Sequence, residues 1–363
     1  MAEQKQETLA VTSVWLTCQQ PARDQRRGRY VAESSSHPGK MLPNLAAHAI
    51  SSYTAPRELV FDPMCGSGTT LVEAVHLGRD ALGVDIEPRF TALAQANLDL
   101  AASQGARGQA RVFTGDSRGL FDLVPASAVG KVSLVLTSPP YGRGTHGLVR
   151  ATSTGVRKRD HRYGDRDPGN LAYAGWSRLL DGFAEILAAS TLLLRPGGTV
   201  VITCRPVRRK PNDFIDLPGE LLHVAKSVGL VPVQRCAAML AAVRDGQIVH
   251  RASMFGLMAV RRARAEGIPV HLVAHEDVLV LRRCRGFAPF GNPGARLVAA
   301  PAREPADPRT TGGTWQFSHV PPARLSDQRG RHGRRRRGPA RVPHHTRLGG
   351  TSPADGPASQ LIR

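Results

Sequence analysis

The sequence has few cysteines and no long apolar run. Its five cysteines are scattered over 363 residues without a C-x-x-C pair, so neither a disulfide framework nor a zinc site is indicated. No run of about 18 apolar residues is present, and the N-terminus lacks the basic and apolar regions of a signal peptide. We therefore expect a cytoplasmic protein without a metal site or a membrane partner.

Acidic residues are too few to balance the basic ones. The 29 Asp and Glu stand against 49 Lys and Arg, which gives a net charge of +20. Such a charge favours a polyanionic partner, most commonly nucleic acid. Only six of the basic residues are lysine, and many of the arginines lie in the C-terminal tail. The charge therefore supports a nucleic-acid partner without establishing one.

Strand-like and helix-like segments alternate between residues 57 and 281. The apolar patterns predict five strands in succession, at 57–61, 81–84, 110–113, 132–136 and 199–203. Two later runs, 231–240 and 275–281, are expected to close the sheet as an antiparallel hairpin. This alternation predicts an α/β fold, a doubly wound Rossmann-like sheet with a closing hairpin.

The composition suggests three regions. We expect an N-terminal extension at 1–36, a domain at 37–284 with basic loops at 143–175 and 244–267, and a disordered basic tail at 285–363. The first loop is long for a compact domain, so it is either a mobile functional segment or a solvated excursion. The tail is rich in Pro, Gly, Arg and Ala, without periodicity. It is a nucleic-acid-binding tail, a plain solvated extension or an out-of-frame end of the gene.

A glycine-rich turn follows the first predicted strand. Its sequence is Asp62-Pro63-Met64-Cys65-Gly66-Ser67-Gly68-Thr69-Thr70, and a segment of helical periodicity comes next. Glycines let a backbone approach a ligand closely, and a helix N-terminus favours negative groups. The turn lacks the third glycine of the dinucleotide fingerprint and the Gly-Lys-Ser/Thr of a phosphate loop. A lone G-x-G of this kind is a weak signal.

Acidic residues end three successive strands of the predicted sheet, as Asp62, Asp85 and Asp116. Each alone is explained as a helix cap or a turn former, but three in succession make an accident less credible. A carboxylate about 20 residues beyond a glycine turn meets a ribose hydroxyl in Rossmann units, as Asp85 would here. A nucleoside cofactor without a long phosphate chain fits this pattern. S-adenosylmethionine is one, with its ribose on Asp85, its adenine amine on Asp116 and its methionine part against the turn.

The fourth predicted strand ends in Thr137-Ser138-Pro139-Pro140-Tyr141-Gly142. Two prolines cannot continue a sheet, because they lack an N–H donor and their φ is fixed. The segment is therefore a rigid loop at the carboxyl end of a strand, the edge at which open α/β sheets bind ligands. Taken by itself, the loop is equally well explained as a structural turn.

Together, these segments resemble the amino-methylating DNA methyltransferases, which act on cytosine N4 or adenine N6. The turn at 62–70 is similar to their cofactor motif, and 137–141 is similar to their catalytic motif. His37-Pro38-Gly39-Lys40 resembles the segment that completes their cofactor pocket, and 275–281 resembles their last strand. The order of the motifs is one of the family's circular arrangements. The sequence departs from the family in having only basic loops where a large target-recognition domain is usual.

The resemblance implies S-adenosylmethionine as cofactor, DNA as partner and three groups of site residues. The expected cofactor-binding residues are Lys40, Asp62, Pro63, Cys65, Gly66, Ser67, Gly68, Thr69, Asp85, Ile86, Asp116 and Ser117. The expected catalytic residues are Ser138, Pro139, Pro140 and Tyr141. The expected nucleic-acid-binding residues are Arg143, Arg157, Lys158, Arg159 and Arg162 of the first basic loop.

The chemistry of amine methylation explains these residue types. The lone pair of an exocyclic amine is delocalised into the base, and acceptors at Ser138 Oγ and the Pro139 carbonyl would let the nitrogen pyramidalise. Tyr141 would stack on a base rotated out of the helix. In the family, Ser at the first motif position is associated with cytosine N4 and Asp with adenine N6. A C5-methylating enzyme needs a Pro-Cys nucleophile, and the sequence has no Pro-Cys pair.

Two alternatives remain. Methyltransferases of guanine N2 in transfer or ribosomal RNA carry a similar glycine turn and an Asn/Asp-Pro-Pro-Tyr loop, but they usually have an N-terminal RNA-binding domain. The second alternative is a non-catalytic nucleic-acid-binding protein on a methyltransferase fold. The intact Ser138-Pro139-Pro140-Tyr141 and the strand-end acids argue against it. Oligomeric state, recognition sequence and a restriction partner stay open.

Overall fold

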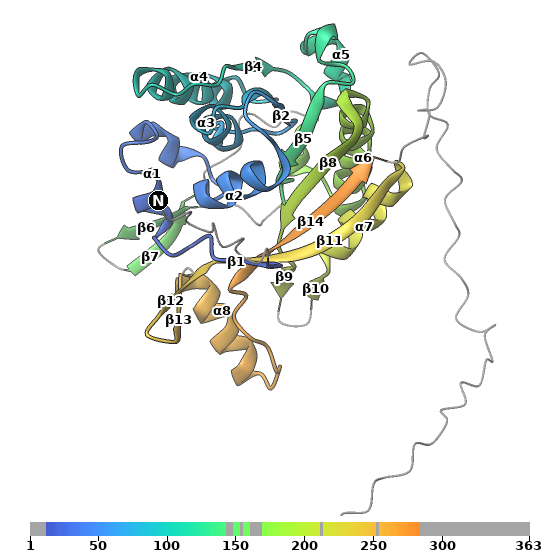
Figure 1. The fold of residues 1–363 in the computed structure, drawn as a ribbon. Coiled ribbons are helices and arrows are strands. Elements are labelled where there is room, and N and C mark those ends of the chain that lie inside the picture. Colours follow the sequence, from blue (N-terminus) through green and yellow to red (C-terminus); the bar gives the residue numbers. More distant parts are fainter. Residues whose placement is uncertain are drawn as a thin grey trace, which may run out of the picture. The chain divides into compact units, whose positions relative to one another are not determined.

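An eight-stranded sheet organises the protein, in the order β1-β11-β14-β8-β5-β2-β3-β4 (Figure 1). The computed structural model describes residues 12–142, 148–152, 155–159, 169–210, 213–251 and 254–283. The strands of this sheet are β1 (Val14–Trp15), β2 (Leu59–Asp62), β3 (Asp80–Asp85), β4 (Ala110–Thr114), β5 (Val132–Thr137), β8 (Leu194–Cys204), β11 (Leu230–Met239) and β14 (His275–Arg283). The predicted α/β class is confirmed.

The strand directions follow the predicted alternation. Strands β4, β3, β2, β5 and β8 are parallel neighbours, whereas β14 runs antiparallel between β8 and β11. The two predicted closing strands therefore do pair, as β11 and β14. They are not joined by a tight turn, however, because a hairpin and a helix lie between them in the chain. Parallel pairing brings the carboxyl ends of the five strands to one edge.

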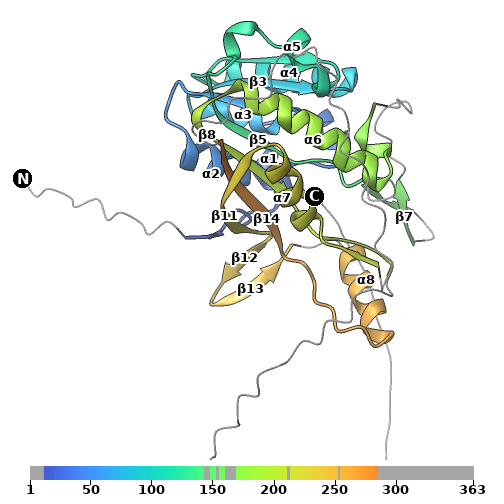
Figure 2. The same cartoon turned by 90° about the vertical axis from the view of Figure 1, so that its right-hand side faces the viewer.

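Helices cover both faces of the sheet (Figures 1 and 2). The helices in the described part of the chain are α1 (Ala22–Arg26), α2 (Pro43–Tyr53), α3 (Thr69–His76), α4 (Pro88–Ser103), α5 (Leu120–Leu123), α6 (Trp176–Leu193), α7 (Leu217–Ser227) and α8 (Met254–Ala265), of which α8 lies away from the faces of the sheet. Side chains of α2, α3 and α4 form one core with alternate strand residues such as Val60 and Leu134. Those of α6 and α7 form the other core with Phe61 and Val135. Neighbouring residues of one strand thus serve opposite cores, as the pleat requires.

Prolines and caps begin several of these helices at the expected places. Pro43 and Pro88 stand in the first turns of α2 and α4, where a missing N–H costs no hydrogen bond. The side chain of Asp216 accepts a hydrogen bond from Gly219 N and caps α7. None of the helices in the described part of the chain has the length and apolar character needed to cross a bilayer.

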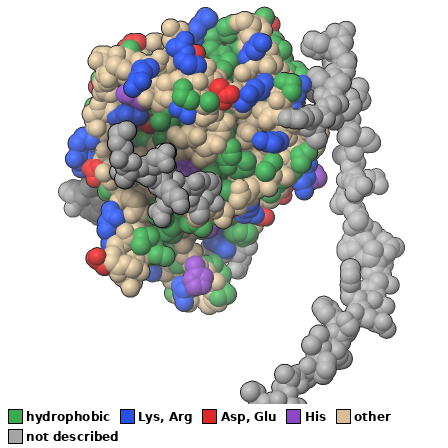
Figure 3. Space-filling model, in the orientation of Figure 1, with side chains coloured by type: hydrophobic (Ala, Val, Ile, Leu, Met, Phe, Trp, Pro, Cys, Tyr) green, Lys and Arg blue, Asp and Glu red, His purple; other side chains and the backbone are tan. Residues whose placement is uncertain are grey.

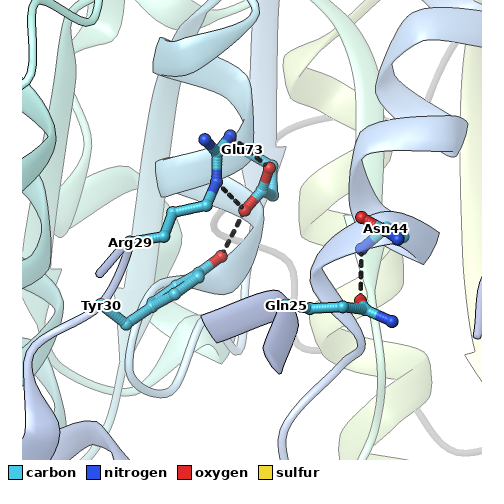
Figure 4. Close-up of polar contacts among 5 residues, drawn as sticks. All are labelled: Gln25, Arg29, Tyr30, Asn44 and Glu73. Carbon is cyan, nitrogen blue, oxygen red and sulfur yellow. Dashed lines mark hydrogen bonds and ion pairs between the residues drawn. The ribbon is translucent and has the colours of Figure 1, made fainter. Parts of the chain in front are cut away.

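Residues 12–36, expected to be part of an extension, pack against the domain. Strand β1 pairs in parallel with β11, and Trp15 is buried. The buried carboxylate of Glu73 on α3 accepts hydrogen bonds from Arg29 Nε at 2.8 Å, Arg29 Nη2 at 2.6 Å and the Tyr30 hydroxyl at 2.6 Å (Figure 4). Gln25 accepts one from the main-chain N–H of Asn44. The polar composition of this segment gave no sign of the packing, because hydrogen bonds and a few aromatic side chains hold the segment in place.

The two regions expected to be basic loops contain regular elements. A hairpin of β6 (Leu148–Thr152) and β7 (Gly155–Arg159) lies within 143–175. The region 244–267 contains helix α8 and strand β13 (Gln247–His250), which pairs with β12 (Ala241–Arg244). A further hairpin, β9 (Val207–Lys210) with β10 (Asp213–Ile215), follows β8. These pairings are local and carry polar sequences, so apolar periodicity could not reveal them. The proposed tail at 285–363 lies outside the described residues.

The ion pair between Arg29 and Glu73 gives a stability prediction. Replacing Arg29 by Ala leaves the Glu73 carboxylate buried with only the Tyr30 hydroxyl as a strong donor. Removing one partner of a buried pair is strongly destabilising, and because Arg29 is about one-third exposed we expect a loss of about 2–3 kcal/mol in the free energy of unfolding, measured by urea titration.

Arg27→Ala is the matched control for this prediction. Its ion pair with Asp24 is exposed on the surface, and such pairs contribute roughly 0–1 kcal/mol. Equal losses for Arg29→Ala and Arg27→Ala would show that the N-terminal segment is not anchored through Glu73.

Candidate active site

A cavity of about 170 Å³ opens at the carboxyl edge of the parallel strands. It brings together nearly all of the site residues expected from the sequence. Those that line it are Lys40, Asp62, Pro63, Cys65, Gly66, Ser67, Thr69, Asp85, Ile86, Asp116, Ser117, Ser138, Pro139, Pro140 and Tyr141. Gly68 is not on its wall. This glycine has φ of +81°, and a Cβ there would lie 2.9 Å from Ala94 Cβ, so it serves the turn and helix packing.

Asp85 joins the end of β3 to the glycine turn that follows β2. Its Oδ2 accepts a hydrogen bond from Gly66 N at 2.8 Å, and its Oδ1 accepts one from Glu87 N at 3.0 Å. Burial raises the pKa of Asp85 to about 6, although these hydrogen bonds work in the opposite direction. Each oxygen can accept a further hydrogen bond from a ligand hydroxyl, so Asp85 can accept hydrogen bonds from the hydroxyls of a ribose.

Asp62 holds the turn from the other side. Its Oδ2 accepts a hydrogen bond from the Thr70 hydroxyl at 2.6 Å, and its Oδ1 accepts one from Met64 N at 3.1 Å. Burial raises the pKa of Asp62 to about 6, against the effect of these donors. The carboxylate therefore joins the strand end to the first turn of α3. Asp62 has this structural role in addition to any contact with a ligand.

Asp116, expected to meet an adenine amine, is paired with Arg118. Its carboxylate accepts hydrogen bonds from Arg118 Nε and from the main-chain N–H of Arg118 at 3.0 Å. Partial burial works to raise the pKa of Asp116, but the bonds and charge of Arg118 hold it below the usual value. The carboxylate stays ionised and lines the cavity, so binding of an amine there remains a prediction. The neighbouring Ser117 hydroxyl donates to the Pro63 carbonyl.

The His37-Pro38-Gly39-Lys40 segment closes the cavity over the glycine turn. The ring of His37 lies 4.2 Å from that of Phe90, and burial lowers the pKa of His37 to about 3. A side chain at Gly66 would collide with this ring. Lys40 Nζ donates to the Ser35 and His37 carbonyls, and burial lowers its pKa to about 8. An ammonium has three donors, so Lys40 can also hold an anionic ligand group.

The Ser138-Pro139-Pro140-Tyr141 loop forms the other half of the cavity together with two residues that sequence reasoning did not assign. Arg205 follows β8, and Glu276 is the second residue of β14. The guanidinium carbon of Arg205 lies 5.9 Å from the centroid of the Tyr141 ring. Burial works to lower the pKa of Arg205, but the nearby Tyr141 and Glu276 raise it. Position just past a strand end, the signal used for Asp85 and Asp116, would have found Arg205.

Asn170 and Glu87 contribute a further contact at the rim. Asn170 Nδ2 donates to Glu87 Oε1 at 2.6 Å, and both residues line the cavity. Asn170 also caps the short 3₁₀ turn Leu171–Tyr173 through the N–H of Ala172. The last part of the first basic loop is thereby fixed to the turn after β3. Nothing in the spacing of the sequence indicates this pair.

The expected nucleic-acid-binding residues fall where side chains are not described. Arg143 and Arg162 lie outside the described residues. Arg157, Lys158 and Arg159 are on strand β7, whose backbone alone is described. No cluster of three or more His, Cys, Asp or Glu residues suited to a metal occurs within the described ranges.

The donors and acceptors of the cavity suit S-adenosylmethionine. At the carboxyl end of β3 the cavity offers Asp85 for a diol, and at the end of β4 it offers Asp116 for an amine. Lys40 supplies a positive charge beside the first turn of α3 for a carboxylate. A phosphate loop is missing, as a cofactor without a phosphate chain requires. The residues present therefore fit this cofactor.

Comparison with known proteins agrees with the sequence motifs. Residues 2–96 match the model of a DNA methylase family. The type II methyltransferase M.MjaII of Methanocaldococcus jannaschii is 29% identical over 75 residues, which are 21% of this chain and 14% of that protein. The tRNA (guanine(10)-N2)-dimethyltransferase of the same organism is 31% identical over 110 residues, or 30% of this chain and 31% of that protein. The matches thus span less than a third of the length of these relatives.

A solved structure with a similar arrangement is TrmN from Thermus thermophilus. It is 17% identical, with a TM-score of 0.42, over 72% of this chain and 53% of that chain.

Among the perturbed groups at the cofactor end, Asp85 and Lys40 predict a bell-shaped pH dependence of ligand affinity. Asp85 accepts hydroxyls best as a carboxylate, so affinity for S-adenosylhomocysteine should fall as pH drops through about 6. Lys40 attracts a carboxylate only when protonated, so affinity should also fall as pH rises through about 8. We expect a change of about tenfold on each side, since one charge-assisted hydrogen bond is worth roughly 1.5–3 kcal/mol. Isothermal titration calorimetry between pH 5 and 9 measures it.

Two variants separate the limbs of this profile. Asp85→Asn should weaken binding and flatten the acid limb, whereas Lys40→Gln should flatten only the alkaline limb. The ligand's own titration is common to all three proteins, so the difference between them reports the side chains. An acid limb that persists in Asp85→Asn would assign the titration to another group.

Proposed function

We propose that this chain, whose residues 2–96 match a DNA methylase family model, is an amino-methylating DNA methyltransferase that transfers a methyl group from S-adenosylmethionine to an exocyclic amine of a DNA base. The observation that carries the proposal is a single cavity lined at one end by the glycine turn and Asp85 and at the other by Ser138-Pro139-Pro140-Tyr141. A cofactor half and an acceptor half share one space, as direct transfer between two bound molecules requires.

The cofactor, when bound, supplies an electrophilic methyl group on a sulfonium. Asp85 binds the ribose, and Lys40 binds the carboxylate of the methionine part. Ser138 Oγ and the Pro139 carbonyl accept the two N–H groups of the target amine, so that its lone pair leaves conjugation with the ring and points at the methyl carbon. The C–N bond would form as the C–S bond breaks, S-adenosylhomocysteine would leave, and the proton lost by the amine would pass to solvent. Pro139 and Pro140 keep the acceptors in place, since a proline ring fixes φ.

Cytosine N4 is the amine that we propose. Ser138 places a hydroxyl where the adenine-methylating members of the family carry a carboxylate. Tyr141 is set in the wall of the cavity, where its ring can stack on a base that has left the helix. The guanidinium of Arg205 lies beside this ring, with its carbon 5.9 Å from the ring centroid.

Duplex DNA would approach the carboxyl edge of the sheet, where the cavity opens. The described elements that leave the sheet at this edge carry exposed arginines, namely Arg208 on β9, Arg244 on β12 and Arg261, Arg262 and Arg264 on α8. On the face drawn in Figure 3, Lys and Arg side chains are spread over the surface without forming one patch. Phosphate contacts from these separate elements would position the duplex without reading its sequence.

Guanine N2 of RNA is the second candidate, favoured by the 110-residue match to a tRNA (guanine(10)-N2)-dimethyltransferase. Incubation with tritiated S-adenosylmethionine and either duplex DNA or RNA, followed by mass spectrometry of the nucleosides, distinguishes the two. N4-methylcytosine in DNA is the expected product. N2-methylguanine in RNA would replace the proposal by this alternative, and label in neither would remove the enzymatic proposal.

Substitutions should separate the two halves of the cavity. Ser138→Ala removes one of the two acceptors of the amine, so we expect turnover to fall by about 10²–10³, the usual effect of losing one such preorganised group. Tyr141→Ala removes the stacking surface and should lower turnover by roughly 10–100-fold. Both should leave the affinity for S-adenosylhomocysteine within about twofold, whereas Asp85→Ala should weaken it. Equal losses of cofactor affinity in all three variants would contradict the assigned roles.

A further inference from the structure

Arg205, Glu276 and Tyr141 form a connected group in the acceptor half of the cavity. All three line it, although they come from segments that are far apart in the chain. Arg205 Nε lies 3.9 Å from Glu276 Oε1, and the Arg205 guanidinium carbon lies 5.9 Å from the centroid of the Tyr141 ring. The side chain of Glu276 is 13% exposed and that of Arg205 is 43% exposed. The carboxylate is therefore buried behind a guanidinium that faces the open part of the cavity.

The distances show that the guanidinium keeps hydrogen-bonding capacity. At 3.9 Å the charges of Arg205 and Glu276 attract, but the atoms are too far apart for a hydrogen bond. A guanidinium has five N–H donors in a planar fork. Glu276 thus supplies an electrostatic hold on Arg205, and Tyr141 orients it, while donors are left for a third partner. In a cavity that must exclude water around a base, such donors need an acceptor.

A base gripped by its exocyclic amine presents an adjacent ring atom to this group. In cytosine, the atom next to the carbon that bears N4 is N3, an acceptor, and O2 beyond it is another acceptor. In guanine, the ring atom between N2 and O6 carries a hydrogen and is a donor. A fork of N–H groups is therefore complementary to the cytosine edge and is opposed by guanine N1–H.

We propose that Arg205, positioned by Glu276 and Tyr141, reads the target base by donating hydrogen bonds to cytosine N3 and O2. The inference rests on the proposed transfer to an exocyclic amine at this cavity and adds the residue that selects the base. Arg205 is a specificity-determining residue that touches the substrate, and Glu276 is a positioning residue that acts through it. The loop of Ser138 recognises that an amine is present, and Arg205 recognises which ring carries it.

The test compares oligonucleotides that contain cytosine or 3-deazacytosine at the target position. The analogue keeps the amine and O2 but has C–H in place of N3. For the unaltered protein, kcat/KM should be about 10–100-fold higher with cytosine, in line with one lost base-edge contact. In Arg205→Met the kcat/KM for cytosine should fall. The ratio of kcat/KM for cytosine to that for 3-deazacytosine should come within about threefold of the ratio of their intrinsic reactivities. That intrinsic ratio is measured with a small alkylating agent in solution.

Matched variants exclude a merely structural effect. Arg205→Lys keeps the charge but not the planar fork, so it should retain part of the discrimination, and it replaces Arg205→Met if that variant does not fold. Glu276→Gln should reduce the discrimination less than Arg205→Met does. Affinity for S-adenosylhomocysteine should be unchanged in all three. Arg107→Met, on the exposed connection between α4 and β4, should leave the ratio unchanged and serves as the control.

The outcomes for the inference and for the proposed function are distinguishable. A protein that methylates cytosine in DNA with the same discrimination before and after substitution of Arg205 overturns the inference and leaves the function standing. Methylation of adenine N6 in DNA and of no cytosine overturns the inference but leaves amine methylation of DNA standing, whereas a protein that methylates no base in DNA overturns both. Methylation of guanine N2 in RNA likewise contradicts the proposed role of Arg205, because that role requires a hydrogen-bond acceptor at the ring atom beside the amine.

Discussion

The hydrogen bonds that Asp85 accepts from Gly66 and Glu87 hold the whole cofactor end of the cavity together. The two N–H groups belong to the turns after two neighbouring parallel strands, β2 and β3, so one buried carboxylate fixes both turns to each other. Asp62 repeats the arrangement one strand away through Thr70 and Met64. Both carboxyls are desolvated enough for their pKa values to rise to about 6, which means that burial costs free energy here. These costly buried carboxylates lie at the place where they would give a ligand preorganised hydrogen-bond acceptors.

The fold was largely predictable, because the parallel strands are buried on both faces and therefore read as continuous apolar runs. Val132–Thr137 is buried at every residue, and its prediction as a strand is confirmed. The missed elements share the opposite character. Strand β1 has two residues, and the hairpins β6–β7 and β9–β10 carry polar sequences paired only with themselves. Such pairings depend on local turns and on neighbours that are distant in sequence. The apolar periodicity of a sequence indicates neither of them.

The cofactor half of the cavity was predictable for a related reason, and the acceptor half was not. Lys40, the glycine turn and Asp85 lie within 46 residues of one another in the chain, and their order follows from consecutive strands that end at one edge. Tyr141 and Arg205 follow β5 and β8, Glu276 lies in β14, and only the order of strands in the sheet brings them together. In particular, β14 is last in the chain but lies beside β8, so Glu276 meets Arg205 through an antiparallel pairing. A hairpin of β11 and β14 could be expected from the sequence, but its side of attachment could not.

The same topology accounts for the lack of a separate recognition domain in the described part of the chain. Strand β11 is parallel to β8, and β14 runs against both, so every connection that leaves β5, β8 or β11, or enters β14, passes the carboxyl edge of the sheet. These connections contain short elements, which are β6–β7, β9–β10, β12–β13 and α8; β7, the β12–β13 hairpin and α8 lie beyond this edge of the sheet in Figure 2. Each is stabilised by its own pairing or helical turn, so each can vary without disturbing the sheet. Contacts with a substrate can therefore be added at this edge, one connection at a time, while the buried carboxylates keep the reacting groups in place.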